Sequence, residues 1–317
     1  MRLFRDAKYH FLDGRRRAYV VSATLIVIGL ISIVVHRGLN AGVEFTGGTL
    51  LQVRFTEQVD AGELRDLLTG VGFGGAQIQQ LRAAGLGGEE GVSEFLFRVQ
   101  TFEQSGESAV GDLVGGALEG SFGADGYEIV RVEAVGPRVG GELQVKATWA
   151  ILLSFLLTLI YLAFRFEWRF GVAAVIATIH DILITFGFIS LLNIEITLAT
   201  VAALLTIVGY SLNDTIVVFD RVRENLRKKR KEAYGETLNR SINETLPRTV
   251  LTSGTTLVAL VSLFLLGGAV IRPFALVLIL GVLIGTYSSI FVASPALLEI
   301  HDAERRRSAR AAHQAAS

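Results

Sequence analysis

The residue best placed to do chemistry is a carboxylate inside an apolar segment. Asp214 lies in a run of apolar residues that begins near Ile196 and continues to Phe219. A charged side chain at membrane depth is costly, so it usually faces the protein interior or a water path. A carboxylate there can bind and release a proton, which makes Asp214 the first functional candidate and its neighbour Asn213 a secondary one. A structural role with local hydrogen bonding is the alternative for Asp214.

A second polar pair interrupts another apolar run. His180 and Asp181 lie about midway along Phe170–Leu192. Adjacent residues on a helix point about 100° apart, so we expect that these two do not readily line one site. We interpret Asp181 as a second polar position within a helix bundle and His180 as a group that titrates near neutral pH. Because no further ligands accompany them, the sequence predicts no metal site.

Hydroxyl side chains form a stripe farther along the chain. Thr245, Thr249, Thr252 and Thr256 recur in steps of four, three and four residues, with Ser253 beside them. This spacing places the threonines on one helical face, which we expect to turn towards a bundle interior. Ser, Thr and Gly also mediate ordinary helix packing in membranes, and we assign packing to most of these hydroxyls.

The elements that must position these residues are membrane spans. The chain has 317 residues, 51% of them hydrophobic, and no cysteine, which excludes disulfides and thiolate metal sites. A bilayer crossing needs about 20 residues. Six apolar segments are long enough: Ala18–His36, Val145–Phe164, Phe170–Leu192, Ile196–Phe219, Val250–Gly268 and Pro273–Leu298. We therefore predict an α-helical polytopic membrane protein with six transmembrane helices. The first segment is interpreted as a retained anchor rather than a signal peptide, because it is long and no small-x-small site follows.

The distribution of charge orients the spans. Residues 37–142 hold sixteen Asp or Glu, seven Arg and no Lys. Most of the other basic residues lie at the two ends of the chain and after the second and fourth spans. Because Lys and Arg favour the cytoplasmic side, we predict five regions: a cytoplasmic N-terminus 1–17, transmembrane helix 18–36, an extracytoplasmic domain 37–144, spans 145–298 with a basic cytoplasmic loop 220–248, and a cytoplasmic tail 299–317. The basic run Arg227–Lys231 is expected to contact anionic lipids, not nucleic acid.

The predicted extracytoplasmic domain alternates strand and helix patterns. We expect strands at Leu50–Phe55, Gln77–Leu81, Glu94–Val99 and Tyr127–Val135, and helices at Ala61–Val71 and Ser108–Ser121. Ile129 and Val130 interrupt the alternation of the last strand. The order βαββαβ is that of an α+β ferredoxin-like domain, placed here between transmembrane helices 1 and 2. The domain has no histidine and no phosphate-binding loop in a strand–helix context, so nothing in it indicates catalysis.

Several motifs follow one another along these elements. They are Gly42–Gly48 after the first span, Gly136–Gly140 before the second, His180–Asp181 in the third, Gly209–Arg221 ending the fourth and Pro247–Thr256 opening the fifth. In this order the chain resembles the SecF members of the SecD/SecF family of protein-export membrane proteins, within the resistance-nodulation-division group. The resemblance extends from about Arg15 to about Leu298. The outer insert is shorter than that expected in SecD, which favours the SecF branch.

This resemblance implies a function and a set of partners. In the group, two related halves of six spans form one unit, so a separate SecD-like six-span partner is implied. The SecYEG translocon, YajC, YidC and a preprotein substrate are further implied partners. The resemblance also implies a location in the bacterial cytoplasmic (inner) membrane and use of the proton motive force to promote preprotein export. The sequence does not distinguish protons from sodium ions.

The resemblance further implies which residues do the work. Asp214, Arg248 and Thr252 match the positions of the family's proton relay. Because arginine stays protonated, it stabilises an ionised carboxylate, and protonation of Asp214 would remove that attraction and let helices repack. A structural motif consists of Gly42, Glu44, Phe45, Gly47 and Gly48, and we expect Glu44 to lie in a turn that fixes the outer insert on the first span.

Alternative functions stay open on the sequence alone. One is a stand-alone ion-driven exporter of small molecules or lipids with the same bundle, and the short insert disfavours it. Another is an assembly factor without a proton role, for which neutralising Asp214 would leave function intact. An enzyme is the weakest interpretation, because the sequence shows no nucleophile–base pair, no His-rich metal site and no nucleotide motif in a suitable context. We expect no cofactor.

Overall fold

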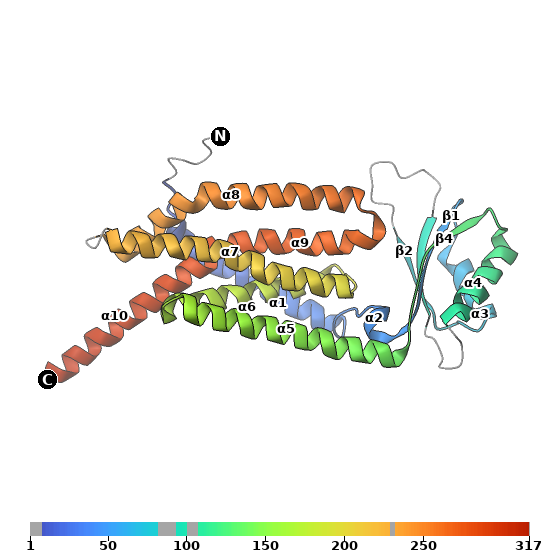
Figure 1. Cartoon of the computed structure of the whole chain (residues 1–317), viewed down its shortest axis with the longest axis horizontal. Coiled ribbons are helices and arrows are strands. Elements are labelled where there is room, and N and C mark those ends of the chain that lie inside the picture. The colour runs from blue at the N-terminus through green and yellow to red at the C-terminus, as the bar shows by residue number, and fades with distance from the viewer. Residues whose placement is uncertain (1–7, 82–92, 100–106, 229–231, 317) are drawn as a thin grey trace. The chain divides into compact units, whose positions relative to one another are not determined.

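The computed structural model describes residues 8–81, 93–99, 107–228 and 232–316. The chain divides into two compact units. The helical unit contains Met1–Asn40, Ile151–Ile194 and Ala199–Ser317, and the α+β unit contains Ala41–Ala150 with Glu195–Leu198. Figure 1 shows the helices and strands of both units with their labels.

Long helices dominate the first unit. In chain order they are η1 (Phe11–Gly14), α1 (Arg15–Val35), α5 (Pro137–Arg165), α6 (Trp168–Leu191), α7 (Leu198–Lys228), α8 (Tyr234–Leu266), α9 (Gly268–Ser288), the π-helical turn η2 (Ser289–Ala293) and α10 (Ser294–Ala316). In the described part of the chain, six helical stretches are long and apolar enough to cross a membrane, the sixth running from α9 through η2 into α10. The prediction of six transmembrane helices is confirmed. Such helices satisfy their backbone hydrogen bonds internally, as a hydrocarbon environment requires.

Burial separates inner helices from outer ones. The core of the helical unit includes Phe170 of α6, Phe219 of α7, Leu238 of α8 and Leu297 of α10. Large apolar side chains of α5 and α1, by contrast, are mostly exposed in the isolated chain. An apolar exterior of this kind suits a lipid or partner environment rather than water.

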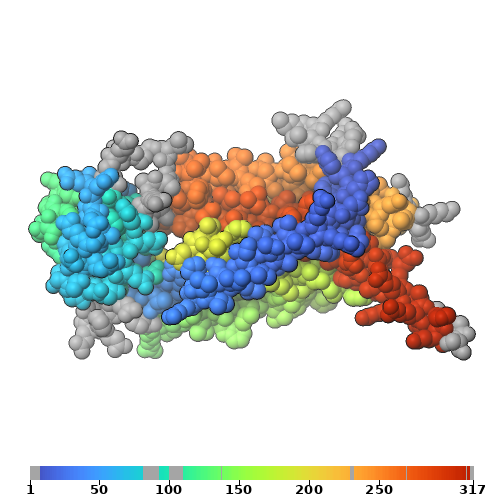
Figure 2. All heavy atoms as spheres, turned by 180° about the vertical axis from the view of Figure 1, so that it is seen from behind, coloured from blue at the N-terminus to red at the C-terminus, as the bar shows by residue number. Residues whose placement is uncertain are grey.

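Helix α1 packs closely along α6. A Cβ atom added at Gly29 would lie only 2.6 Å from Gly187 Cα, so the two backbones approach more closely than any side chain would allow. Small residues at such crossings are typical of membrane helices. Figure 2 shows α1 in blue on the surface of the helical unit. This contact sets the position of the side chains that α1 directs towards α6.

The α+β unit is built on a four-stranded antiparallel sheet. Its elements are α2 (Val43–Thr46), β1 (Gly48–Phe55), α3 (Ala61–Gly70), β2 (Gln77–Leu81), β3 (Ser93–Val99), α4 (Glu107–Phe122) and β4 (Tyr127–Val135). The strand order is β2-β3-β1-β4. Side chains of the sheet and of helices α3 and α4 form a separate core that includes Phe55, Phe95 and Phe97. The antiparallel sheet and its two helices agree with the predicted α+β class.

An irregularity in β4 occurs where the sequence alternation breaks. Gln52 of β1 pairs with Arg131, whereas the next residue, Val53, pairs with Ile129, so Val130 has no partner in this register. One extra residue on one strand is the definition of a β-bulge, which shifts the face of every residue beyond it. The break that we noted at Ile129 and Val130 is therefore a feature of the sheet.

The basic segment between the fourth and fifth spans is mostly helical. α7 continues nine residues past Phe219 to Lys228, and α8 already begins at Tyr234. The predicted spans end earlier because charged residues lower the hydropathy there, although they do not prevent a helix from continuing beyond the bilayer. Both helices therefore extend out of the apolar region as a polar helical pair.

Candidate functional site

Asp214 lies inside the bundle on α7. Its side chain is nearly completely buried, at 2% exposure. Ser253 of α8 donates a hydrogen bond of 3.3 Å to Asp214 Oδ2, and the Ser253 hydroxyl also lies 2.7 Å from Thr286 Oγ1 of α9. Thr286 in turn donates to the carbonyl oxygen of Val282 at 2.7 Å. Three helices thus meet at one carboxylate through a short chain of hydroxyls.

Arg248 interacts with Asp214 over a distance rather than by a direct ion pair. The guanidinium acts electrostatically on the Asp214 carboxylate. Among the ion pairs of the described residues, none joins the two within 4.0 Å. Arg248 is exposed in this isolated chain. The cation is therefore near the buried carboxylate but remains accessible.

Two other predicted residues, Thr252 and Asn213, form no hydrogen bond to Asp214 among those of the described residues. Thr252 is half-buried and donates to the carbonyl oxygens of Arg248 and Thr249 within its own helix, at 2.9 and 3.1 Å. Asn213 is exposed on α7. The hydroxyl that reaches the carboxylate is that of Ser253, the next residue after Thr252. Within the predicted stripe, Thr245 and Thr249 are buried, which agrees with a face turned to the interior.

His180 and Asp181 form one site, so our expectation that they would not readily do so is wrong. His180 Nδ1 lies 2.8 Å from Asp181 Oδ1, although the residues are adjacent on α6. The angle of about 100° describes the directions of the Cα–Cβ bonds. The imidazole ring and the carboxylate reach far enough beyond Cβ to close that angle. Both side chains are buried, with His180 at 6% and Asp181 at 1% exposure.

Hydroxyl groups from three other helices complete this site. Asp181 Oδ2 accepts hydrogen bonds from Ser211 of α7 and from Ser288 of α9, the latter at 2.7 Å. His180 Nε2 lies 2.9 Å from Ser22 Oγ of α1. The two carboxylate sites use the same helices, because α7 supplies both Ser211 and Asp214, and α9 supplies both Thr286 and Ser288. These three serines were not predicted from the sequence, since single serines in apolar spans usually serve in packing.

The glycine motif after α1 contacts the start of α7. Gly42 N donates to Ile196 O at 2.8 Å, and the Glu44 carboxylate accepts from the backbone N–H of Leu198, the first residue of α7. A carboxylate is favourable at a helix N-terminus, where the backbone N–H groups lack partners. Glu44 therefore caps α7, and this contact differs from the predicted attachment to the first span.

The remaining motif residues allow close backbone approach. Gly47 and Gly48 have φ angles of +73° and +121°, which suit glycine. A Cβ atom at Gly140 would lie 3.0 Å from Gly47 N, so α5 begins directly against this turn. Phe45 is buried. Arg98 of β3 adds an ion pair to Glu195, at 2.6 Å, next to the segment that Gly42 binds. The motif thus joins the sheet to the residues that precede α7.

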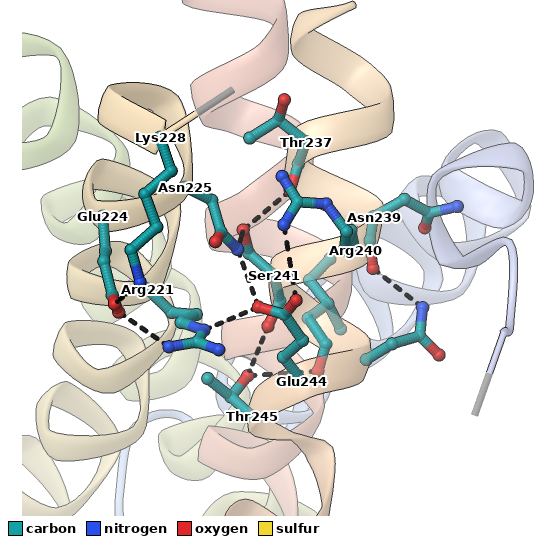
Figure 3. Close-up of polar contacts among 12 residues, drawn as sticks. Arg221, Glu224, Asn225, Lys228, Thr237, Asn239, Arg240, Ser241, Glu244 and Thr245 are labelled. Atoms are coloured by element: carbon teal, nitrogen blue, oxygen red, sulfur yellow. Dashed lines mark hydrogen bonds and ion pairs between the residues drawn. The ribbon is translucent and has the colours of Figure 1, made fainter. Parts of the chain in front are cut away.

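Polar side chains brace α7 against α8 outside the predicted spans. Arg221 Nε donates to Glu244 Oε2 at 2.6 Å, and Asn225 Nδ2 donates to the same oxygen at 2.7 Å and to Ser241 at 3.0 Å. Figure 3 shows these side chains directed towards one another from the two helices. Because α7 carries Asp214 and α8 carries Ser253, this brace joins the two helices that meet at the buried carboxylate.

The N-terminal segment is fastened to the same helix, α8. Asn243 accepts from Tyr9 N at 2.9 Å and donates to Tyr9 O at 2.8 Å, while Asn239 accepts from Phe11 N at 2.9 Å. Two asparagine side chains thereby satisfy backbone groups of the segment that precedes α1.

In the described part of the chain, no group of three or more His, Cys, Asp or Glu could hold a metal ion.

The geometry defines a class of protein: a multi-pass membrane protein with an α+β domain between its first two spans and two buried carboxylate sites in its bundle. The family model described as protein export membrane protein SecD/SecF, C-terminal, matches residues 118–303, and the model of the SecD/SecF GG motif matches residues 32–59. The first match covers more than half of the chain. The chain belongs to the SecD/SecF family of bacterial membrane proteins.

Individual relatives agree with this assignment. A protein translocase subunit SecF from Gemmatimonas aurantiaca is 47% identical over 95% of this chain and 89% of its own length. The protein translocase subunit SecDF of Thermus thermophilus is 42% identical over 91% of this chain, which spans 38% of that longer protein. The crystal structure of the Thermus SecDF superposes with a TM-score of 0.82 at 39% identity, over 95% of this chain and 40% of that one. These relatives support the assignment as a Sec protein translocase subunit.

Proposed function

We propose that this chain is the SecF-type half of an accessory Sec complex that uses the proton motive force to promote preprotein export. Asp214 is the proton carrier, Arg248 is its counter-charge, and Ser253 is the hydroxyl that touches the carboxylate. The observation that carries the proposal is a carboxylate at 2% exposure that accepts one long hydrogen bond, from Ser253 at 3.3 Å. A buried carboxylate with few donors is stable only if it can be neutralised by a proton or a nearby cation.

The proposed partner is based on the length of a relative. In Thermus thermophilus, one SecDF chain is more than twice as long as the part that matches this protein. A separate SecD-like chain of six spans is therefore the proposed partner here, and the Sec translocon the machine that both assist. Contacts with YajC, YidC, preprotein and anionic lipids stay predictions, as does the orientation with both termini in the cytoplasm.

The mechanism requires that charge at Asp214 bias the arrangement of α7 and α8. When Asp214 is ionised, the Arg248 guanidinium attracts it; when Asp214 is protonated, that attraction is lost. The polar brace at Arg221 and Glu244 keeps the two helices paired at one end, so a change at Asp214 is expressed as a tilt or shift rather than a separation. At the other end, α7 begins at the residue that Glu44 caps. A shift of α7 therefore acts directly on the glycine motif.

The test is export of a secreted reporter in cells whose own SecF is replaced by this chain, with its SecD-like partner supplied. Asp214→Asn should cause precursor to accumulate at membrane levels matched to the unmodified chain. Asp125→Asn, which neutralises an exposed carboxylate of the α+β unit, is the matched control and should export normally. Equal export by the Asp214 variant and the unmodified chain would contradict the proposal and favour an assembly role.

A further inference from the structure

The His180–Asp181 site is not used by the relay just described, and its hydrogen bonds have a fixed direction. The carbonyl oxygen of Ala18 can only accept, and Tyr287 donates its single hydroxyl hydrogen to it at 3.0 Å. In the arrangement that gives every one of these contacts a hydrogen, Ser22 donates to Tyr287 Oη at 3.3 Å. Ser22 has only one hydrogen, so it then accepts from His180 Nε2 at 2.9 Å. In this arrangement Nε2 carries a hydrogen.

The other ring nitrogen then decides how many protons the site holds. His180 Nδ1 and Asp181 Oδ1 are 2.8 Å apart, which requires a hydrogen between them. Either Nδ1–H donates to a carboxylate, or a protonated carboxyl donates to Nδ1. In both arrangements the pair holds one proton more than a neutral imidazole beside an ionised carboxylate. Without that proton, two lone pairs would face each other at hydrogen-bond distance.

The surroundings agree with a pair that is neutral as a whole. The elements packed on α6 are α1, α9, η2 and α10. Among the described residues of these elements, Tyr287 is the ionisable side chain that lies against His180, with ring centroids 6.2 Å apart. The ion pair of Arg169 and Glu304 joins α6 to α10, but it lies eleven residues before His180. From α7, Ser211 faces Asp181, and Asp214 follows three residues later. Because no basic side chain among the described residues forms an ion pair or hydrogen bond with Asp181 other than His180 itself, a bound proton balances its carboxylate at low cost.

We propose that His180 and Asp181 form a second proton-binding site, loaded in this structure, which exchanges its proton only when the helices around it rearrange. On release the proton passes to water, leaving an ionised carboxylate and a neutral imidazole. The inference rests on the proposed proton-driven function and adds a second site to it. Two features support exchange rather than permanent retention. The site shares α7 and α9 with Asp214, and the π-helical turn η2 begins directly after Ser288, where such turns frequently mark functional positions.

Release has a structural consequence at α1. A neutral imidazole whose single hydrogen moves to Nδ1, towards the carboxylate, no longer donates to Ser22. The Ser22–His180 bond is the polar link between α1 and α6 at this level, next to the close contact of Gly29 and Gly187. Ser22 then turns its hydrogen to Nε2 and gives up its contact with Tyr287 of α9. Loss of the proton should therefore weaken the polar link between α1 and α9, while Ser211 and Ser288 keep their bonds to Asp181.

The test uses the full chain with its SecD-like partner in lipid nanodiscs, with ¹⁵N-labelled histidine. Nuclear magnetic resonance reports the protonation of each ring nitrogen, and infrared spectroscopy reports a protonated carboxyl. At neutral pH we expect either a doubly protonated His180 ring or a protonated carboxyl that disappears in Asp181→Asn. A proton-release titration to alkaline pH should yield about one proton fewer per complex in Asp181→Asn than in the unmodified complex. Should the amide variant fail to accumulate, Ser22→Ala is the second variant, and it should raise the neutral fraction of His180 at a given pH.

Two results would overturn the inference. A neutral ring beside an ionised carboxylate at neutral pH would show that no extra proton is bound. A proton retained both throughout the alkaline titration and under an imposed gradient would show a permanent structural pair. Neither result depends on Asp214: if Asp214→Asn exports normally yet His180 behaves as expected, the proposed function fails while the bound proton stands. If Asp214→Asn blocks export and His180 is neutral, the second site alone fails.

Discussion

The two buried carboxylates of the bundle differ in how firmly their neighbours fix a proton. At the Asp181 site, the carboxylate contacts His180, Ser211 and Ser288, and His180 contacts Ser22, so side chains from three other helices hold the pair. At Asp214 one hydroxyl, that of Ser253, reaches the carboxylate, and the bond is long at 3.3 Å. Fewer bonds must therefore rearrange for a proton to exchange at Asp214 than at Asp181.

The two sites also differ in how accessible they are. Asp181 and its partner His180 are enclosed by hydroxyls from three other helices, whereas Asp214 lies near an exposed arginine. The Asp181 site is thus complete within this chain, and the cation near Asp214 remains accessible to a second chain. The two sites share α7 and α9 but differ in how firmly their carboxylates are held.

Replacing each carboxylate by alanine should give the largest difference in stability between the two sites. Asp181→Ala leaves His180, Ser211 and Ser288 without their shared partner, and loss of one member of a buried pair costs about 3 to 5 kcal/mol. Asp214→Ala removes one long hydrogen bond, so its cost should be about 1 kcal/mol. Thermal unfolding of both variants in the same detergent measures the difference. Equal loss of stability in the two variants would mean that Asp181 is no better satisfied than Asp214.

Moving α1 away from α6 should have an intermediate effect. Gly187→Ala places a Cβ atom 2.8 Å from Gly29 Cα, so the helices must separate, at a cost of about 1 to 3 kcal/mol. Gly209→Ala on α7 meets no atom within 4 Å and is the matched control. The first variant should lower the unfolding temperature and weaken the bond between Ser22 and His180, seen as a change in the His180 resonances. Unchanged resonances in Gly187→Ala would show that the α1 contact does not hold the site.

Removing single hydroxyl groups should have the smallest effect, and it tests which hydroxyl serves Asp214 during export. Ser253→Ala removes the hydroxyl that touches the carboxylate, and we expect export to fall by about fivefold, equivalent to about 1 kcal/mol. Thr252→Ala removes a hydroxyl that bonds only to its own helix in this structure, and export should stay near that of the unmodified chain. If Thr252 serves the relay, as its position in the family motif predicts, the two variants will show the reverse order.

Local patterns in the sequence predicted much of the fold. Short-range hydrophobic periodicity predicts the six spans and the four strands and two helices of the insert. It also predicts the interruption at Val130. The buried position of Asp214 followed from a single carboxylate in an apolar run. Helical continuation of α7 and α8 beyond the spans was not visible, because charged residues remove the hydropathy signal while leaving helix formation unaffected.

Contacts between distant segments could not be predicted in the same way. Ser22 meets His180 across 158 residues, Ser288 meets Asp181 across 107, and Glu44 meets Leu198 across 154. Serine is common at helix crossings, so no local pattern separates a serine that completes a site from one that packs. The choice of Ser253 over Thr252 likewise depends on the rotation of α8, which hydroxyl spacing alone leaves undetermined.

The fastening of the N-terminal segment has a consequence for how the protein is made. The backbone of Tyr9 is held by Asn243, and that of Phe11 by Asn239, 234 and 228 residues later in the chain. During synthesis the segment emerges before α8 and must wait until the first turns of that helix have been translated before its partners exist. At about 5 to 20 residues per second, that wait lasts on the order of ten seconds or more. Until α6 has been made, the first span must rely on its own hydrophobicity to stay in the bilayer, and the backbone groups of Tyr9 and Phe11 gain their asparagine partners only after that.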